Sequence, residues 1–146
     1  MSDDQLPIHM TPEDWTQAYE EGVPHWAESS QPSPLAKQLL EILGQTSGNH
    51  ILEIGVGNGR DCIYFASEGN RVSGIDIVEK AIEMALDNVE EAGFSEKVDL
   101  HVGDAENLTY PDETFDAVYS VSVLHATNTQ KSFKELSRVL KKGGKF

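Results

Sequence analysis

The sequence predicts an α/β fold in which helices cover both faces of a doubly wound, mostly parallel sheet. From residue 50 onward, short apolar runs alternate with segments of helical periodicity, as they do in consecutive βαβ units. A glycine-rich stretch joins the first apolar run to the first helical segment, and polar or glycine residues follow the later runs. Because parallel sheets bind ligands at the carboxyl ends of their strands, we expect the functional site at that edge.

The composition indicates one ordinary domain with few classes of partner. A chain of 146 residues can bury its own core, and the only cysteine, Cys62, leaves no partner for an internal disulfide. No apolar stretch is typical of a signal peptide or a membrane span, so we expect a cytoplasmic protein. The net charge of -14 repels nucleic acid phosphates and anionic membranes. We therefore expect neither nucleic acid nor a membrane as partner.

The first third of the chain predicts two helices. Residues 11–22 carry a candidate N-cap, a proline in the first turn and a terminal glycine, which is typical of a short helix. A loop rich in proline and serine follows, and residues 34–43 predict an amphipathic helix that ends at Gly44. We expect residues 1–48 to form an N-terminal helical attachment or lid on a main domain of residues 49–146.

The main domain predicts strands and helices in alternation. The expected strands are residues 50–55, 71–77, 97–104 and 115–123, and the expected helices are residues 60–69, 79–93 and 130–144. Gly143 and Gly144 are expected to end the last helix, so that Lys145 and Phe146 open a fifth strand whose successors are missing. Such a sheet would leave an unpaired edge. Either the chain is part of a longer protein, or a second copy covers the edge in a homo-oligomer.

Three glycines at alternate positions, Gly55, Gly57 and Gly59, connect the first strand to the first helix. Backbone N–H groups and a helix N-terminus can face a polar or anionic ligand there, since no Cβ atom blocks its approach. A tight turn without a ligand is the alternative. No lysine follows the glycines, which argues against a P-loop, and Arg60 stands where a dinucleotide fingerprint needs its third glycine.

An acidic residue, Asp76, ends the second strand 21 residues after Gly55. In this topology a carboxylate at that position can accept hydrogen bonds from both hydroxyls of a ribose. A solvated carboxylate or a helix N-cap is the alternative. Gly103, Asp104 and Ala105 end the third strand on the same edge, and the chain leaves the fourth strand beside it. The joint pattern favours a nucleoside-like ligand.

With these features together, the chain resembles the class I S-adenosylmethionine-dependent methyltransferases. Five segments in the order and spacing of that family carry the resemblance: "LEIGVGNGR", "GIDI", "GDAENL", "FDAVYSVSVLH" and "ELSRVLKKGGKF". It covers residues 50–146 and implies a Rossmann-like sheet, S-adenosylmethionine as cofactor and S-adenosylhomocysteine as product. Two mild departures are Val56, where the family often has Cys or Ala, and Lys142, where it has Pro.

The resemblance also implies which residues bind the cofactor. Glu53, Gly55 and Gly57 are implied for the methionine portion, and Gly59, which ends the same turn, is also counted as a cofactor-binding residue. Those implied for the ribose and the adenine are Asp76 for the hydroxyls, Ile77 for the face of the base, and Asp104 with the amide of Ala105 for its polar edge. Ser120 is expected near the amino acid group of the cofactor.

The expected reaction is an in-line methyl transfer to a small soluble acceptor, with sulfur, oxygen or another soft nucleophile. Positioning and exclusion of water can supply most of the catalysis, and a base is useful only if the nucleophile arrives protonated. His125, just beyond the fourth strand, is the candidate base, with a helix-cap or surface role as its alternative. No metal is expected. A module that binds the cofactor without catalysis is the alternative function.

The N-terminal segment resembles one branch of the family, the tellurite-resistance and thiopurine S-methyltransferase-like enzymes. The resemblance rests on "WTQAYEEGVPHW" together with "GNGRDCIYFASEGNRVSGID". In that branch a Trp/Tyr helix and a Pro-Trp loop cover the cofactor and the substrate. Trp15, Tyr19 and Trp26 would then help to cover the cofactor and the substrate; packing on the sheet is the alternative.

Overall fold

The computed structural model describes residues 13, 16–17, 31–121 and 127–146. Most of the helix expected over residues 11–22 lies outside the described residues, as do the three aromatic residues at positions 15, 19 and 26. The candidate base His125 lies outside them as well. The described residues contain the whole glycine-rich turn and the ends of four strands, so the cofactor site can be built from them.

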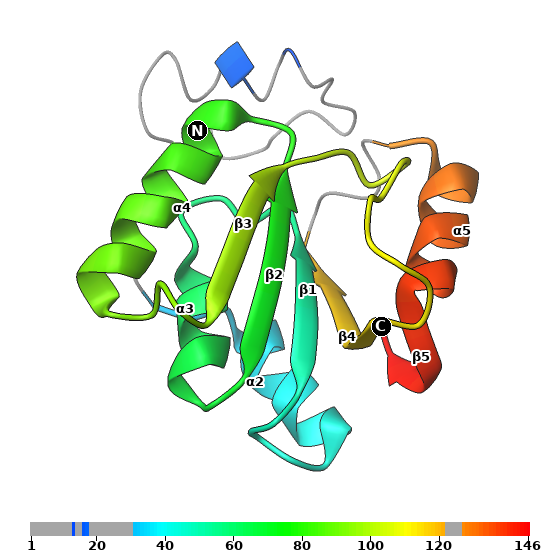
Figure 1. Ribbon diagram of the computed structural model, residues 1–146, viewed down its shortest axis with the longest axis horizontal. Helices are drawn as coiled ribbons and strands as arrows, with labels where there is room; N and C mark the ends of the chain where they lie inside the picture. Colours follow the sequence, from blue (N-terminus) through cyan, green and yellow to red (C-terminus); the bar gives the residue numbers. More distant parts are fainter. Residues whose placement is uncertain (1–12, 14–15, 18–30, 122–126) are drawn as a thin grey trace, which may run out of the picture.

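The described residues form a five-stranded parallel sheet, which confirms the predicted fold class (Figure 1). The strands are β1 (His50–Ile54), β2 (Arg71–Asp76), β3 (Val98–Val102), β4 (Phe115–Ser120) and β5 (Leu140–Lys145), in the spatial order β3-β2-β1-β4-β5. The chain adds strands on one side of β1 and then continues with β4 on the other side. This change of direction between β1 and β4 is the topological switch point, where such sheets bind ligands.

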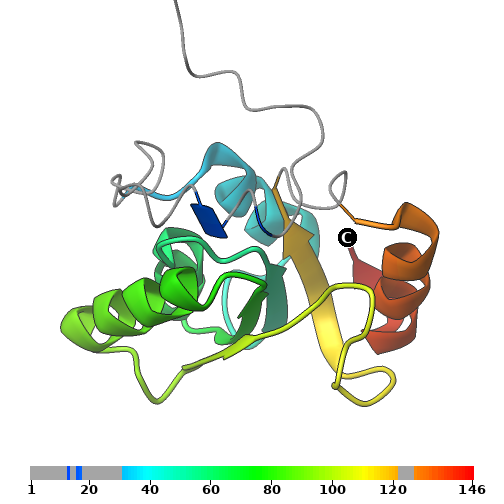
Figure 2. The same ribbon diagram turned by 90° about the horizontal axis from the view of Figure 1, so that it is seen from above.

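Two hydrophobic clusters hold helices on opposite faces of the sheet (Figures 1 and 2). The helices of the first cluster are α2 (Pro34–Leu43), α3 (Arg60–Ser67) and α4 (Glu79–Ala92), and the helix of the second is α5 (Thr129–Val139). Successive strand residues such as Ile51 and Leu52 point into different clusters, as the two-residue period of a strand requires. Within the described ranges, no helix combines the length and apolarity needed to cross a lipid bilayer.

Helix α2 has the bounds that the sequence predicts. The hydroxyl of Ser33 caps it by accepting a hydrogen bond from the amide of Leu35, and Gly44 ends it in the left-handed conformation at φ 75°. Its buried residues join the same core as α3 and α4. This helix therefore packs directly on the sheet, although the expected N-terminal attachment includes it.

The last helix is shorter than expected, because α5 ends at Val139 and β5 begins at the next residue. The carbonyls of Arg138 and Val139 accept hydrogen bonds from the amides of Glu113 and Thr114, at 2.9 and 2.8 Å. These donors satisfy the end of the helix without a glycine cap. The expected helical end at Gly143 and Gly144 is therefore wrong, and both glycines belong to β5, which pairs with β4.

Candidate functional site

Hydrogen bonds join the carboxyl ends of the first four strands into one edge. The amide of Gly55 donates to the carbonyl of Ile75 at 2.8 Å, which ties the glycine-rich turn to β2. The amide of Gly103 donates to the carbonyl of Asp76 at 3.0 Å, and the hydroxyl of Ser120 donates to the carbonyl of Ile54 at 3.2 Å. The residues that the sequence predicts for the cofactor thus come together from β1, β2, β3 and β4.

The glycine-rich turn needs glycine for the path of its own backbone. Gly55, Gly57 and Gly59 have φ values of 82°, 56° and 83°, where any side chain would be strained. Gly59 also packs at the start of α3, and a Cβ atom there would lie 3.1 Å from the Cβ of Ala85 on α4. The missing side chain at position 59 therefore permits close packing of two helices, whereas a role of Gly59 in cofactor binding stays a prediction.

The carboxylate of Asp76 lies directly beside this turn. Its Oδ2 accepts from the amide of Gly57 at 3.1 Å and its Oδ1 from the amide of Val78 at 3.0 Å. Burial raises the pKa of Asp76 from its ordinary value, while these backbone N–H groups act in the opposite direction. Each carboxylate oxygen can accept a further hydrogen bond, as a ribose ligand needs. The N-cap of α4 is Val78, without a side-chain cap, so the alternative role of Asp76 as the helix N-cap is wrong.

Apolar side chains remain exposed next to Asp76. Ile77 is 41% exposed and Val102, at the end of β3, is 54% exposed. Isolated exposed aliphatic residues are common, but these two flank a carboxylate at a ligand-binding edge. A nucleoside needs an acceptor for its ribose hydroxyls and an apolar surface for its planar base. The Asp76 carboxylate and the neighbouring aliphatic side chains provide both. The residues present therefore fit the adenosine portion of the expected cofactor.

Asp104 and Ala105 begin the connection from β3 to β4. The Oδ1 atom of Asp104 accepts from the amide of Glu106 at 2.9 Å, and its carbonyl accepts from the amide of Asn107 at 3.0 Å. The Asp104 side chain is exposed, whereas Ala105 is buried in the α5 core. The tight turn thus holds an exposed carboxylate and a buried anchor side by side at the edge of the site.

Glu53 lies beneath the turn and is only 4% exposed. The thiol of Cys62, on α3, donates to its Oε1 at 2.9 Å. Burial, with the nearby carboxylate of Asp61, raises the pKa of Glu53 well above its ordinary value. Burial likewise raises the pKa of Cys62, with Glu53 adding to the effect, so this cysteine is a packed thiol and no nucleophile.

A buried polar cluster that was not predicted from the sequence lies close to Glu53. Asp61, 5% exposed, accepts from the amide of Ser33 at 2.7 Å and from the hydroxyl of Tyr119 at 2.9 Å. The hydroxyls of Ser33 and Tyr119 lie 3.0 Å apart. Burial raises the pKa of Tyr119 above its ordinary value. One signal was available: Asp61 lies four residues before Phe65, and thus on the inner face of α3.

The Asp61 cluster connects the site to the start of α2. Asp61 belongs to the first turn of α3, immediately after the glycines, while Tyr119 lies opposite Glu53 on β4. Ser33 is the cap of α2. Within the described residues, no group of three histidine, cysteine or acidic side chains could hold a metal ion.

Comparisons with known proteins match most of the chain. The family model described as "Methyltransferase domain" matches residues 52–146. Among curated relatives, methyltransferase GfsG of Streptomyces halstedii is 30% identical over 84% of this chain and 47% of its own length. The 27-O-demethylrifamycin SV methyltransferase of Amycolatopsis mediterranei (strain S699) is 34% identical over 77% of this chain and 42% of its own length. The chain thus spans less than half the length of these relatives.

Solved structures share the same arrangement of strands and helices. The crystal structure of the [4+2]-cyclase SpnF matches with a TM-score of 0.74 and 25% identity, covering 91% of this chain and 57% of that one. The matched family model extends from β1 through β5 and includes all the predicted cofactor-binding residues, from Glu53 to Ser120. The chain belongs to the methyltransferase domain family, within the class I S-adenosylmethionine-dependent methyltransferases.

Proposed function

We propose that this chain binds S-adenosylmethionine at the carboxyl edge of its sheet and serves methyl transfer to a small soluble acceptor. The observation that carries the proposal is Asp76, anchored by the amides of Gly57 and Val78 beside the exposed Ile77. When bound, the cofactor supplies an activated methyl group. Membership in the methyltransferase domain family supports the proposal.

The proposed contacts follow the geometry of the edge. Asp76 accepts hydrogen bonds from the ribose hydroxyls, Ile77 packs on the base, and Asp104 with the amide of Ala105 reads its polar edge. The glycine-rich turn and Glu53 line the methionine portion, whose amino acid group lies near Ser120. These residues bind and orient; exclusion of water around the acceptor supplies much of the rate.

The acceptor is proposed to be a small molecule with a soft nucleophile, sulfur or oxygen. The rifamycin methyltransferase relative and the net charge of -14 support a small acceptor over nucleic acid. The resemblance of the N-terminal segment to the tellurite-resistance and thiopurine branch is the basis for sulfur-like acceptors. A screen of thiopurines, tellurite and hydroxylated compounds separates these groups, and activity with hydroxylated compounds alone would contradict the branch.

His125 is proposed as a base that takes a proton from a methyl acceptor that arrives protonated. Its test is a pH profile of turnover for wild type and His125→Gln with a hydroxyl acceptor.

The chain is further proposed to be cytoplasmic, which cell fractionation tests. It is also proposed to form a homo-oligomer that covers the β5 edge, which light scattering of the purified chain tests.

Cofactor binding is tested by isothermal titration of the folded chain with S-adenosylmethionine and S-adenosylhomocysteine. Saturable heat from both ligands is expected. Asp87→Asn is the matched control, because Asp87 is an exposed aspartate on α4 and its substitution removes a charge away from the site. A folded sample that gives no saturable heat with either ligand would contradict the proposal.

A second candidate is cofactor binding without methyl transfer. The likeness to SpnF favours this candidate, because that protein has the same fold and is described as a [4+2]-cyclase, which is a different class of reaction from methyl transfer. Labelled S-adenosylmethionine incubated with pools of small acceptors distinguishes the two candidates. Saturable binding with no label transferred to any pool favours the second candidate, and transfer to one pool favours the first.

A further inference from the structure

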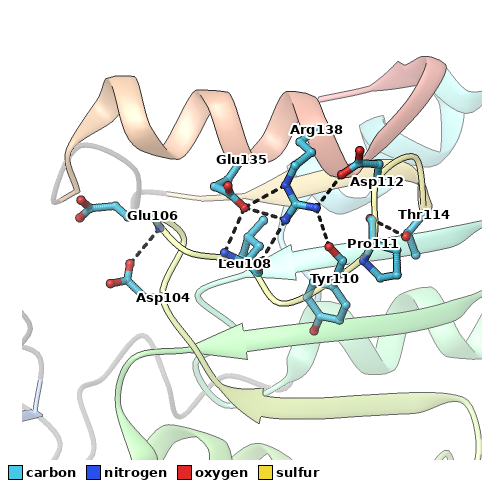
Figure 3. Close-up of polar contacts among 9 residues, drawn as sticks. All are labelled: Asp104, Glu106, Leu108, Tyr110, Pro111, Asp112, Thr114, Glu135 and Arg138. Carbon is cyan, nitrogen blue, oxygen red and sulfur yellow. Dashed lines mark hydrogen bonds and ion pairs between the residues drawn. The ribbon is translucent and has the colours of Figure 1, made fainter.

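The connection from β3 to β4, residues 103–114, follows α5 along its length (Figure 3). Arg138 holds the middle of this connection through its backbone. Its Nη1 donates to the carbonyl of Tyr110 at 2.7 Å, and its Nη2 donates to the carbonyl of Leu108 at 3.0 Å. A guanidinium presents several donors in a fixed plane, so one side chain can bind two carbonyls and fix their separation.

Glu135, one turn earlier on α5, completes the attachment. Its Oε2 accepts from Nη2 of Arg138 at 2.7 Å and from the amide of Leu108 at 3.2 Å. The backbone N–H and C=O of Leu108 are therefore both bound by this one ion pair. Asp112 adds a contact from its Oδ1 to Nη1 of Arg138 at 2.9 Å. The hydrogen bond from Arg138 lowers the pKa of Glu135, so the pair stays charged at neutral pH.

The first residues of the connection are attached to the other end of α5. The Oε2 atom of Glu106 accepts from the amide of Asn128, the cap of α5, at 3.2 Å. The amide of Glu106 in turn binds the carboxylate of Asp104 at 2.9 Å. The side chains of Ala105 and Leu108 are buried in one core with α5. Asp104 therefore lies directly before two residues, Glu106 and Leu108, that bind opposite ends of α5.

We infer that Arg138, paired with Glu135, is a positioning residue that holds Asp104 and Ala105 against the adenine edge and thereby sets the preference for a 6-amino purine. The inference rests on the proposed cofactor site. A fixed carboxylate and amide accept and donate only to the matching base edge, whereas a loosened turn adapts to either edge and loses the discrimination. Arg138 touches neither base nor methyl group and acts through the backbone of Leu108.

The test compares S-adenosylhomocysteine with S-inosylhomocysteine, which carries a 6-oxo group in place of the 6-amino group. Dissociation constants of both are measured by titration for wild type, Arg138→Gln, Arg138→Lys and Glu135→Gln. For wild type we expect at least about tenfold weaker binding of the inosyl ligand, because its 6-oxo group and its N1–H mismatch both the Asp104 carboxylate and the Ala105 amide. Arg138→Gln is expected to bring the ratio to about twofold, because the forked contact to both carbonyls is lost.

The conservative variants keep the inference testable if Arg138→Gln does not fold. Arg138→Lys keeps the charge but cannot bind both carbonyls, so it is expected to lower the ratio of the two dissociation constants. Glu135→Gln keeps an acceptor oxygen for the amide of Leu108 and is expected to retain part of the wild-type discrimination. Lys134→Gln, which removes an exposed charge from the same helix, is the control and should keep the wild-type ratio.

Three results overturn the inference. If wild type binds S-adenosylhomocysteine and S-inosylhomocysteine equally tightly, the site has no preference for a 6-amino purine and the inference is wrong. A ratio that stays at the wild-type value in both Arg138 variants assigns the ion pair to stability alone, even if both ligands bind more weakly. A folded wild type that binds neither ligand overturns the proposed function itself, and that outcome is separate because it needs no variant.

Discussion

The thiol of Cys62 donates to Oε1 of Glu53 across 2.9 Å, and both side chains are buried under the glycine-rich turn. Neither group gains by ionising there, because burial raises the pKa of each. A hydrogen bond between a thiol and a carboxyl group, both withdrawn from solvent, therefore lies under the turn that is proposed to admit the methionine portion.

Cys62 should resist alkylation in the native chain. A raised pKa lowers the fraction of Cys62 that is present as the reactive thiolate, roughly tenfold for each pH unit of the rise. Burial also blocks the access of the reagent to the sulfur. We expect iodoacetamide at pH 8 to label the folded chain at least about tenfold more slowly than the chain in urea. Mass spectrometry of the intact chain gives the rate directly, since Cys62 is the only cysteine. Equal rates in both states would contradict a buried thiol.

Glu53 should make stability fall as the pH rises. Its folded pKa is raised, so above the ordinary pKa near 4.5 the unfolded chain loses a proton that the native chain keeps. The unfolded state then binds fewer protons, and the free energy of unfolding declines by up to ~1.4 kcal/mol per pH unit until the folded pKa is reached. Glu53→Gln removes this pH dependence and keeps an acceptor for Cys62.

The measurement is urea unfolding of both chains at pH 5 and pH 8. We expect wild type to lose more stability than Glu53→Gln between these values, because only wild type has the ionisable group. Parallel pH dependence of the two chains would show that Glu53 ionises normally in the native state.

Asp76→Ala should weaken binding of S-adenosylhomocysteine by about 1–3 kcal/mol, the cost of leaving polar groups of the ligand unpaired. The variant also frees the amides of Gly57 and Val78, so its folding is checked by circular dichroism. Titration calorimetry measures the loss against the Asp87→Asn control. Affinity equal to wild type would remove Asp76 from the proposed ribose contact.

Asp61 and Tyr119 should be coupled in stability. Tyr119→Phe removes the hydrogen bond to the Asp61 carboxylate together with the one shared with the Ser33 hydroxyl, and is expected to cost about 1.5–3 kcal/mol. Asp61→Ala should cost more, since it leaves the amide of Ser33 and the hydroxyl of Tyr119 without their buried acceptor. A double-mutant cycle by urea unfolding should give a coupling of roughly 0.5–3 kcal/mol. Additive effects would show that the two side chains stabilise the fold independently.

Gly74→Ala should destabilise the fold by about 1–3 kcal/mol through overpacking. A Cβ atom at position 74, in the middle of β2, would lie 2.5 Å from Cγ1 of Val56 and 2.7 Å from Cδ2 of Leu100. Gly93→Ala is the comparison, because Gly93 has φ 85° and nothing within 4 Å of an added Cβ, so it reports backbone strain alone. Thermal unfolding measures both, and a neutral Gly74→Ala would show that the core can move aside.

Most of the fold was predictable from local patterns. Alternating periodicities predicted four strands and the helices between them, and the Gly44 end of α2 follows from its glycine. The end of α5 was not predictable in this way, because its carbonyls are satisfied by Glu113 and Thr114, some 25 residues earlier in the chain. Leucine and lysine at the start of β5 favour a helix locally, and pairing with β4 overrides that preference.

The candidate site was predictable to the extent that the topology alone positions it. Asp76 ends β2 and Asp104 closely follows the end of the neighbouring parallel strand β3, so the alternation of elements is enough to bring them to one edge. The partners of Asp61 lie 28 and 58 residues away in sequence, and no local pattern indicates them. The same holds for Gly59, whose packing against Ala85 depends on how two helices meet.

The attachment of residues 103–114 to α5 has a consequence for how this part of the molecule opens. Since the amides of Glu113 and Thr114 satisfy the last carbonyls of the helix, α5 cannot fray at that end without releasing the connection. Helix and connection then form one cooperative unit in the sense of native-state hydrogen exchange. The amides of Leu108, Glu113 and Thr114 should exchange with the same opening free energy as the interior amides of α5.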